Sequence, residues 1–213
     1  MHTNLSYMVE PEPSRGRNPY RSTALSLMHN GVLDALQSLL LVRKWSSITM
    51  ADVAAAAGIS RGTLYNEFQS RRGLARHYAL RLTDSIVTGM RAAIDEHHSD
   101  GYGAMHTVFR DFFDRVANDP LAQVLRTEDA PSDILRLITV ESQFLVDHAT
   151  EQLSHTFQHS WVNANQYDAT VMGQAVVRAA LSYLALPPSD ADEAATGMAH
   201  LLTPYIESIK TSS

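Results

Sequence analysis

The chain has 213 residues, enough for one small and one larger domain, and 45% of its residues are hydrophobic, as in an ordinary globular protein. It contains no cysteine, which excludes a disulfide scaffold, a thiol nucleophile and a cysteine-ligated metal. There is no run of about 18 apolar residues and no signal-like segment near Met1. We therefore expect a cytoplasmic protein that is neither secreted nor membrane-spanning.

The net charge of −6 argues at first against a nucleic-acid partner, but the charges are unevenly distributed. Between Arg15 and Arg81, ten lysine and arginine residues stand against three acidic residues, a balance of +7. From Asp84 onward, seven basic residues stand against eighteen acidic ones, a balance of −11. A basic N-terminal part on an acidic body is typical of a DNA-binding protein whose second domain faces away from the duplex.

Residues 1–20 contain three prolines and no apolar periodicity, so we expect a flexible basic N-terminal arm. Its Arg15 and Arg17 either reach into a minor groove, as basic arms do, or belong to a merely disordered tail. From Arg21 onward, apolar residues recur at helical spacing. This predicts a helix that covers the next helices from behind, with Leu25, Met28, Val32, Leu36, Leu39 and Leu40 on its apolar face.

Residues 48–74 have the pattern of two short helices joined by a glycine turn, followed by the start of a third. Thr49 suits the N-cap of the first helix, and Asp52 suits the positive end of its dipole. Gly58 can adopt the left-handed conformation that ends a helix, and the apolar Ile59 should then turn inward.

Ser60 suits the N-cap of the second helix, Arg61 to about Phe68, in which Leu64 and Phe68 share a face at four-residue spacing. Ser70 then caps a further helix that opens with two arginines. This is the pattern of a helix-turn-helix. The outer face of the second helix carries short or hydrogen-bonding residues that suit the major groove, namely Arg61, Gly62, Thr63, Tyr65 and Asn66.

Over about residues 21–75 the sequence resembles the TetR family of bacterial transcriptional repressors. One departure is that the family often has lysine where Arg71 stands and an acidic residue where Arg72 stands, so the doubled charge here could add a phosphate contact. The alternative is a helical interaction protein or enzyme whose helix-turn-helix is incidental. The resemblance rests on Thr49, Asp52-Val53-Ala54, Ala57-Gly58-Ile59-Ser60, Gly62-Thr63-Leu64-Tyr65, Phe68, Ser70-Arg71 and Gly73-Leu74.

The resemblance implies a homodimeric repressor that binds palindromic double-stranded operator DNA. Bases would be read by Arg61, Thr63 and Asn66, while Gly62 lets the helix lie close to the duplex. The resemblance assigns phosphate contacts to Thr49, Tyr65 and Arg71. Ser60, the cap of the second helix, completes the expected DNA-binding residues.

Beyond the motif no segment alternates like a strand, so we expect an all-α chain of about nine helices. Residues 21–70 should form a three-helix, helix-turn-helix DNA-binding domain, and residues 71–213 a helical ligand-binding and dimerisation domain. The helices expected in the second domain span 71–98, 103–117, 121–126, 131–159, 166–186 and 189–210, with a kink at Pro204.

The last two helices carry apolar stripes, which usually belong to a protein's own core. The family resemblance implies instead that they pair with their copies in a second subunit. A dimer also makes physical sense, because one short recognition helix reads few bases and two-fold symmetry doubles the contacts. The expected interface residues are Val171, Ala175, Ala179, Met198, Leu201, Leu202 and Tyr205.

A helical body of this size can hold a cavity between its middle helices, and TetR-like regulators use such a body to sense a small molecule. Most wall candidates are aliphatic or aromatic, which favours a small apolar effector, such as a fatty acid or alkane derivative, over a sugar or nucleotide. Arg178 interrupts an apolar run and should pair with an acid at the subunit interface or with a ligand's acidic head group. The rival views are that the wall candidates are plain core and that the body responds to nothing. The ligand-binding candidates are Phe109, Phe113, Leu121, Leu125, Ile138, Glu141, Phe144, His148 and Arg178.

Signals for chemistry are weak throughout the chain. His155 and His159 have a spacing that can chelate a metal, but no third ligand is evident. There is no nucleophile elbow, glycine-rich phosphate loop or recurring acid pair. We therefore expect no catalytic residues, no metal and no cofactor, and the chain should not be an enzyme.

Overall fold

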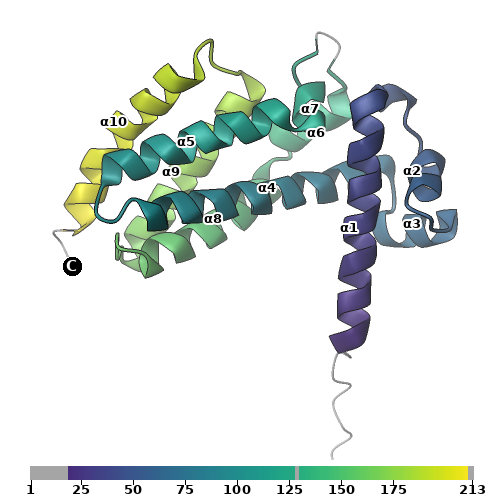
Figure 1. Ribbon diagram of the computed structural model, residues 1–213, viewed down its shortest axis with the longest axis horizontal. Helices are drawn as coiled ribbons and strands as arrows, with labels where there is room; N and C mark the ends of the chain where they lie inside the picture. The colour runs from purple at the N-terminus through teal and green to yellow at the C-terminus, as the bar shows by residue number, and fades with distance from the viewer. Residues whose placement is uncertain (1–18, 128–129, 211–213) are drawn as a thin grey trace, which may run out of the picture.

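The computed structural model describes residues 19–127 and 130–210, in which every regular element is a helix (Figure 1). This confirms the expected all-α class. The elements are α1 (Pro19–Val42), the 3₁₀-helix η1 (Trp45–Ser47), α2 (Met50–Ala56), α3 (Arg61–Phe68), α4 (Arg71–Glu96), α5 (Gly101–Asn118), α6 (Pro120–Val124), α7 (Ser132–Ile138), α8 (Gln143–His159), α9 (Gln166–Ala185) and α10 (Ala191–Lys210).

The helix-turn-helix lies at one end of the molecule, where α1 stands across the start of α4 and covers α2 and α3 (Figure 1). Thr49, Ser60 and Ser70 are the N-caps of α2, α3 and α4, as the sequence predicts. Gly58 has a φ of 68°, which confirms its left-handed turn between α2 and α3. Gly73 has a different reason to be glycine, because a Cβ there would collide with the carbonyl oxygen of Phe68.

One stretch of α1, Thr23–Val42, is long and apolar enough to cross a membrane by length and composition alone. A helix that contributes to a protein core passes the same test. Val32, Leu33 and Leu36 are buried in the core of the helix-turn-helix unit, and Asp34 on the same helix forms an ion pair with Arg81 of α4. Because 22% of the stretch is buried in the structure, these contacts explain only part of its apolar composition, and length and composition alone are weak evidence for a membrane span.

The body is built around α4, which runs from the helix-turn-helix unit along the length of the molecule (Figure 1). Helix α5 lies against α4 and packs extensively on α10, while α8 packs on α4 and α9. Most of the buried side chains of α4, α5, α8, α9 and α10 belong to one hydrophobic core.

The helix expected over residues 131–159 is two helices in the structure, α7 and α8, separated by a turn at residues 139–142. Local hydrogen bonds stabilise this turn. The Thr139 hydroxyl donates to the carbonyl of Leu135, the Ser142 hydroxyl donates to that of Thr139, and the amide of Glu141 donates to that of Arg136. Such side-chain bonds compete with the helical pattern, and apolar spacing does not reveal them.

The core of the helix-turn-helix unit extends beyond residue 70. Leu121 of α6 and Ile134 and Leu137 of α7 are buried in the same cluster as Leu64 and Phe68 of α3. Hydrophobic contacts therefore cross the expected domain boundary at residue 70. The boundary itself stays a prediction.

Candidate nucleic-acid interface and internal cavity

The outer face of α3 presents the residues that the sequence predicts to read DNA. Leu64 and Phe68 are 0% and 1% exposed, which fixes the inner face of the helix. None of the ion pairs within the described residues involves Arg61. The side chains on the outer face are exposed, and they are those of Arg61, Thr63, Tyr65 and Asn66, with Gly62 among them.

Ser60 and Thr63 form the start of α3. The Ser60 hydroxyl accepts a hydrogen bond from the Thr63 amide at 3.0 Å, and the two hydroxyls lie 2.9 Å apart. One turn further along the helix, Glu67 Oε2 lies 2.9 Å from Nε2 of His29 on α1. The recognition helix is therefore capped at its start and attached to α1 near its end.

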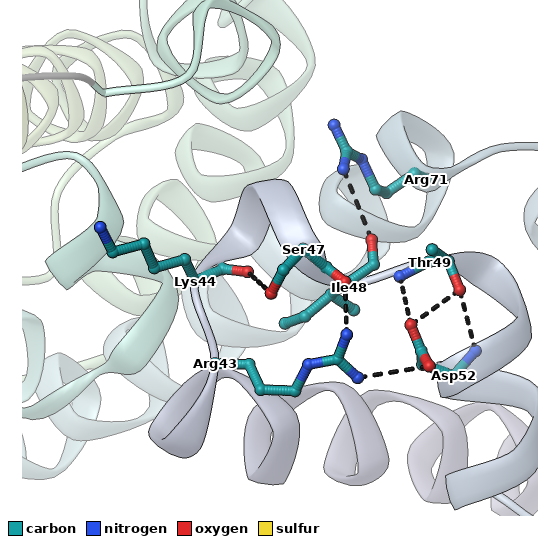
Figure 2. A network of polar contacts seen from close by, with 7 residues as sticks. All are labelled: Arg43, Lys44, Ser47, Ile48, Thr49, Asp52 and Arg71. Carbon is teal, nitrogen blue, oxygen red and sulfur yellow. Dashed lines mark hydrogen bonds and ion pairs between the residues drawn. The ribbon is translucent and has the colours of Figure 1, made fainter.

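The start of α2 is fixed by a capping box, shown in Figure 2. The Thr49 hydroxyl accepts a hydrogen bond from the Asp52 amide, and the Asp52 carboxylate accepts from the Thr49 amide at 2.8 Å and from its hydroxyl at 2.7 Å. Arg43 adds an ion pair to Asp52 at 3.3 Å. The Thr49 hydrogen bonds and, after them, the contact with Arg43 lower the pKa of Asp52 to about 2.

The guanidinium of Arg71 binds other residues of the chain. Its Nη1 donates to the carbonyl oxygen of Ile48 at 3.4 Å, as Figure 2 shows. The same Nη1 donates to the carbonyl oxygen of Trp45 at 3.3 Å, and Nη2 lies 3.4 Å from Oδ2 of Asp133 on α7. The guanidinium also stacks on the Trp45 ring, 4.8 Å from its centroid. These bonds use only part of the five donors of the guanidinium, so Arg71 also connects elements of the chain and its expected phosphate contact stays a prediction.

Five residues connect the helix-turn-helix unit to α7 and the turn after it, and we call them the junction cluster. Asp133 accepts hydrogen bonds from Arg71 and, at 3.2 Å, from the indole Nε1 of Trp45. Arg72 forms an ion pair with Glu141, whose other oxygen lies 2.7 Å from Nε of Arg136. The junction cluster consists of Trp45, Arg71, Arg72, Asp133 and Glu141.

A cavity of about 90 Å³, partly open to the surface, lies between α4, α5, α6, α7, α8 and α9. Its lining is apolar except for Thr83. Three of the predicted ligand-binding residues, Leu121, Leu125 and Ile138, line it. Sequence reasoning missed most of the others, which are Ala79, Leu82, Thr83, Ile86, Val87, Met90, Phe112, Val116, Ala122, Ile134, Leu137, Leu145, Ala149, Leu153, Val177, Ala180, Leu181 and Leu184.

The three predicted aromatic wall residues lie outside the cavity. Phe109 and Phe113 are buried, but they pack edge-on against Tyr183, with ring centroids 6.5 and 5.2 Å away. Phe144 lies under the guanidinium of Arg76, which is 3.9 Å from its ring centroid. These three are corrected to packing residues. Apolar spacing marks them as buried, but it does not tell which side of a helix faces the cavity.

The polar candidates also lie outside the cavity. Glu141 belongs to the junction cluster, and His148 Nε2 lies 2.6 Å from Oδ1 of Asp84 on α4. Arg178 is exposed on α9 in the single chain, and its expected pairing with an acid of a second subunit or with a ligand head group stays a prediction. Glu141 does have a specific charged partner, but that partner is Arg72 of the junction cluster.

The expected subunit interface divides into two sets. Met198 and Leu202 are 9% and 7% exposed and pack in the chain's own core, which corrects their assignment as interface contacts. Val171 and Leu201 are 37% and 69% exposed, and Ala175 is exposed between them in the sequence. Ala179 is half-buried, and Tyr205 donates its hydroxyl to Asp168 at 2.8 Å.

The remaining predictions concern the arm and metals. Arg15 and Arg17 lie outside the described residues. His155 and His159 stack with ring centroids 4.0 Å apart, and Nδ1 of His159 lies 2.8 Å from the carbonyl oxygen of His155. No group of three potential metal ligands gathers among the residues that the structure describes.

Two family models match the sequence. One is described as "Bacterial regulatory proteins, tetR family" and covers residues 32–78. The other is described as "Bacterial Tetracyclin repressor, C-terminal domain" and covers residues 100–204. The matches therefore span the helix-turn-helix unit and most of the body.

Among individual proteins, the chain is 44% identical over 191 residues to the HTH-type transcriptional regulator AlkX of Mycobacterium tuberculosis, which is 90% of each chain. It is 36% identical to the TetR family repressor AlkX of Dietzia sp. strain DQ12-45-1b, implicated in biodegradation of n-alkanes, over 85% of this chain and 96% of that one, with a TM-score of 0.80. FadR of Thermus thermophilus, solved in complex with lauroyl-CoA, shares the fold at 14% identity and a TM-score of 0.53, over 83% of this chain and 93% of that one.

Proposed function

The chain belongs to the TetR family of bacterial transcriptional regulators, and on that premise we propose that it is a repressor that binds a palindromic operator as a homodimer and is released by a small hydrophobic effector. Such a protein acts in the cytoplasm, where the DNA lies. The observation that carries the proposal is the apolar cavity, whose wall residues Leu121, Ile134 and Leu137 are also part of the helix-turn-helix core.

Operator recognition rests on the exposed face of α3. Arg61 can donate two hydrogen bonds to a guanine, and Thr63 and Asn66 offer shorter hydrogen-bonding groups to neighbouring bases. Gly62 carries no side chain that would hold the helix away from the groove. Thr49, Tyr65 and Arg71 remain proposed phosphate contacts, and Arg71 in addition binds Trp45, Ile48 and Asp133 within the chain.

Dimerisation is proposed to use the exposed apolar residues of α9 and α10, namely Val171, Ala175 and Leu201. Two subunits paired in this way would carry their recognition helices to successive turns of the major groove, about 34 Å apart. Ala179 and Tyr205 lie half-buried on the same two helices and would complete the surface.

The effector is proposed to be a fatty acid or an alkane-like molecule. The cavity lining offers Thr83 as its polar residue, so a ligand rich in hydroxyls would lose hydrogen bonds to water without replacing them. An alkyl chain instead gains about 0.8 kcal/mol for each methylene that leaves water. The implication of the related Dietzia repressor in n-alkane biodegradation points to the same chemistry.

The volume of the cavity suggests how the effector releases DNA. At about 90 Å³ it is far smaller than typical ligand pockets of about 300–1,000 Å³, so a bound chain must push its walls apart. Helix α7 is one of these walls, through Ile134, Leu137 and Ile138. Asp133 on the same helix binds Trp45 and Arg71. Displacement of α7 would therefore disturb the helix-turn-helix unit and the start of α4, and thus the spacing of the recognition helices.

Operator selection from a random duplex library tests the DNA-binding half of the proposal. Wild-type protein should select a palindrome and bind it with an affinity that falls steeply with salt. Arg61→Ala should relax sequence preference at one position of each half-site, whereas Arg91→Ala, on the exposed part of α4, should not. Equal binding of selected and random duplexes by wild-type protein would contradict the proposal.

A chain-length series tests the effector half. Fatty acids from octanoate to palmitate are titrated against the complex of protein and selected operator, with glucose and AMP as polar controls. Release that strengthens as the chain lengthens is the expected result. Absence of release by every apolar compound would refute a hydrophobic effector while leaving operator binding intact.

A helical interaction protein or enzyme with an incidental helix-turn-helix was the alternative reading. The family to which the chain belongs is one of transcriptional regulators, and both family models support that class.

A further inference from the structure

A polar groove opens on the surface beside the apolar cavity. It has a volume of about 440 Å³ and lies between α1, α4 and α5, with Tyr78, Arg81, Leu82, Arg115 and Asp119 among its lining residues. Leu82 also lines the cavity, and Leu121, two residues after Asp119, lies on the cavity side. The groove and the cavity thus share a wall.

Arg115 is the cation in this groove that no carboxylate neutralises. Its Nη1 donates to the Ser85 hydroxyl at 3.0 Å, and none of the ion pairs within the described residues involves it. The guanidinium also lies over Gly89, where a Cβ would come within 3.0 Å of Nη2. The absence of a side chain at Gly89 therefore lets the arginine lie flat against α4.

The other charges of the groove are already matched. Arg81 Nη1 lies 2.5 Å from Oδ1 of Asp34 on α1, and its guanidinium stacks over the Tyr78 ring. Asp119 is 8% exposed and accepts hydrogen bonds from the amides of Leu121 and Ala122 and from the Tyr78 hydroxyl. The carboxylate of Asp119 is thus held by three donors within the chain, and Arg115 is left to face the groove.

The cavity lacks the positive charge that the groove has. Its lining contains no cationic residue, so it can hold an alkyl chain but cannot stabilise an ionised head group. An amphipathic anion whose chain enters the cavity must therefore leave its head outside, and the groove offers a free guanidinium next to the shared wall.

We propose that the polar groove binds the carboxylate of a fatty acid whose chain fills the cavity, with Arg115 as the residue that selects an anionic over a neutral head. This rests on the proposed hydrophobic effector. The planar guanidinium can donate two parallel hydrogen bonds to a carboxylate, a geometry that an alcohol cannot match. Movement of the Leu82 side chain joins the two spaces.

The same geometry couples the head group to DNA binding. Arg81 joins α4 to α1 through Asp34, Gln37 and the carbonyl of Asn30. A carboxylate in the groove competes with Asp34 for Arg81 and loosens the attachment of α1 to α4. A fatty acid should accordingly release operator at a lower occupancy of the protein than an alcohol of equal length does.

The test compares decanoate with decan-1-ol, which have the same chain and differ in head-group charge. Calorimetric titration of the full-length protein should give tighter binding of decanoate. Arg115→Gln should weaken decanoate by about tenfold, the range of a charge-assisted hydrogen bond, and leave decan-1-ol unchanged. Arg115→Lys, which keeps the charge and loses the fork, should fall between. Arg110→Gln is the matched control, because Arg110 is on α5 but pairs with Asp192 outside the groove.

A second readout follows the head group itself. The ¹³C shift of carboxyl-labelled decanoate bound to wild-type protein should titrate at lower pH than in Arg115→Gln, because the guanidinium stabilises the ionised form. A variant that is merely less well folded would weaken both ligands and would not move this titration.

The outcomes separate the two proposals. If Arg115→Gln changes both ligands equally, or neither, the groove does not hold the head group, while the hydrophobic effector stands. Tighter binding of decan-1-ol than of decanoate to wild-type protein has the same meaning. If wild-type protein binds neither compound, the hydrophobic effector is refuted and the groove assignment falls with it.

Discussion

Arg71 and Asp133 show how far the role of a single residue depends on its partners. The sequence places Arg71 at the start of a helix beside the DNA-binding motif, where an exposed arginine would reach a phosphate. Its guanidinium also bonds to the carbonyls of Trp45 and Ile48 and to Asp133, which follows it by 62 residues in the chain. A partner at that separation is invisible to local reasoning. By contrast, Thr49 and Asp52 are three residues apart, and their contact follows from sequence alone.

At the same scale, Asp52 makes the stability of the chain depend on pH. Its pKa falls from 3.8 to about 2 in the folded protein, so its contribution is fully present above about pH 4 and is lost as the pH falls toward 2. Asp52→Asn should therefore be less stable than wild type in urea at pH 5, and the difference should shrink at pH 3. Asp95→Asn, on the exposed end of α4, controls for the loss of a negative charge. A difference that stays constant between the two pH values would contradict this account.

At the scale of elements, α7 is the connection between the cavity and the DNA-binding end. Its residues 134, 137 and 138 line the cavity, and helical spacing puts them on one face. Asp133 and, just after the helix, Glu141 hold Arg71 and Arg72 at the start of α4. Under the proposed function, this short helix, with cavity-lining residues and ion pairs to the start of α4, would transmit displacement between the two.

Asp133→Ala should shift the ligand-free protein toward its effector-bound form. We expect operator affinity to fall and fatty-acid affinity to rise, each by about fivefold, because the linkage is reciprocal and the pair is partly exposed. Fluorescence anisotropy with operator and calorimetry with decanoate measure the two effects. The control is Asp192→Ala on α10, which removes the carboxylate partner of Arg110 on α5, away from the junction cluster. It should change neither the operator affinity nor the fatty-acid affinity.

A double-mutant cycle decides between the two roles of Arg71. If Arg71 acts through Asp133, Arg71→Ala combined with Asp133→Ala should weaken operator binding no more than the stronger single variant. If Arg71 contacts phosphate, the two losses should add, and the salt dependence of binding should become shallower with Arg71→Ala alone. The second pattern would support the role expected from the sequence.

At the scale of the whole molecule, the positive charge and the proposed dimer surface lie at different places. The N-terminal part carries the positive balance and the body the negative one, which orients the helix-turn-helix end toward DNA. The exposed apolar residues of α9 and α10 lie on the body, away from α3 (Figure 1). A dimer formed there leaves both recognition helices free.

Leu201→Glu should break this dimer. Leu201 is 69% exposed in the single chain, so a glutamate there is harmless to the fold but would place a charge in an apolar interface. Sedimentation velocity should show monomers, and operator affinity should drop by more than the contacts of one half-site. Val140→Glu, at a residue 74% exposed in the turn before α8, is the matched control and should remain dimeric. An intact Leu201→Glu dimer would move the interface elsewhere.

The sequence by itself determined the features that depend on neighbouring residues. The helix caps at Thr49, Ser60 and Ser70, the left-handed Gly58 and the inner face of α3 all follow from spacings of a few residues, because capping and helical periodicity act over one or two turns. The all-α class follows from the same periodicity, and the motif was enough to suggest the family.

Tertiary structure alone decided which buried side chains face the cavity and which charges find partners. Phe109 and Phe112 are three residues apart on one helix and both buried, yet only Phe112 lines the cavity. Burial follows from hydrophobicity, but the direction of a buried face depends on where distant helices pack. The same holds for Asp133 and Glu141, whose partners Arg71 and Arg72 are brought to them by the fold. Interactions within one or two helical turns can be predicted from the sequence, whereas those between distant segments form only when the chain has packed.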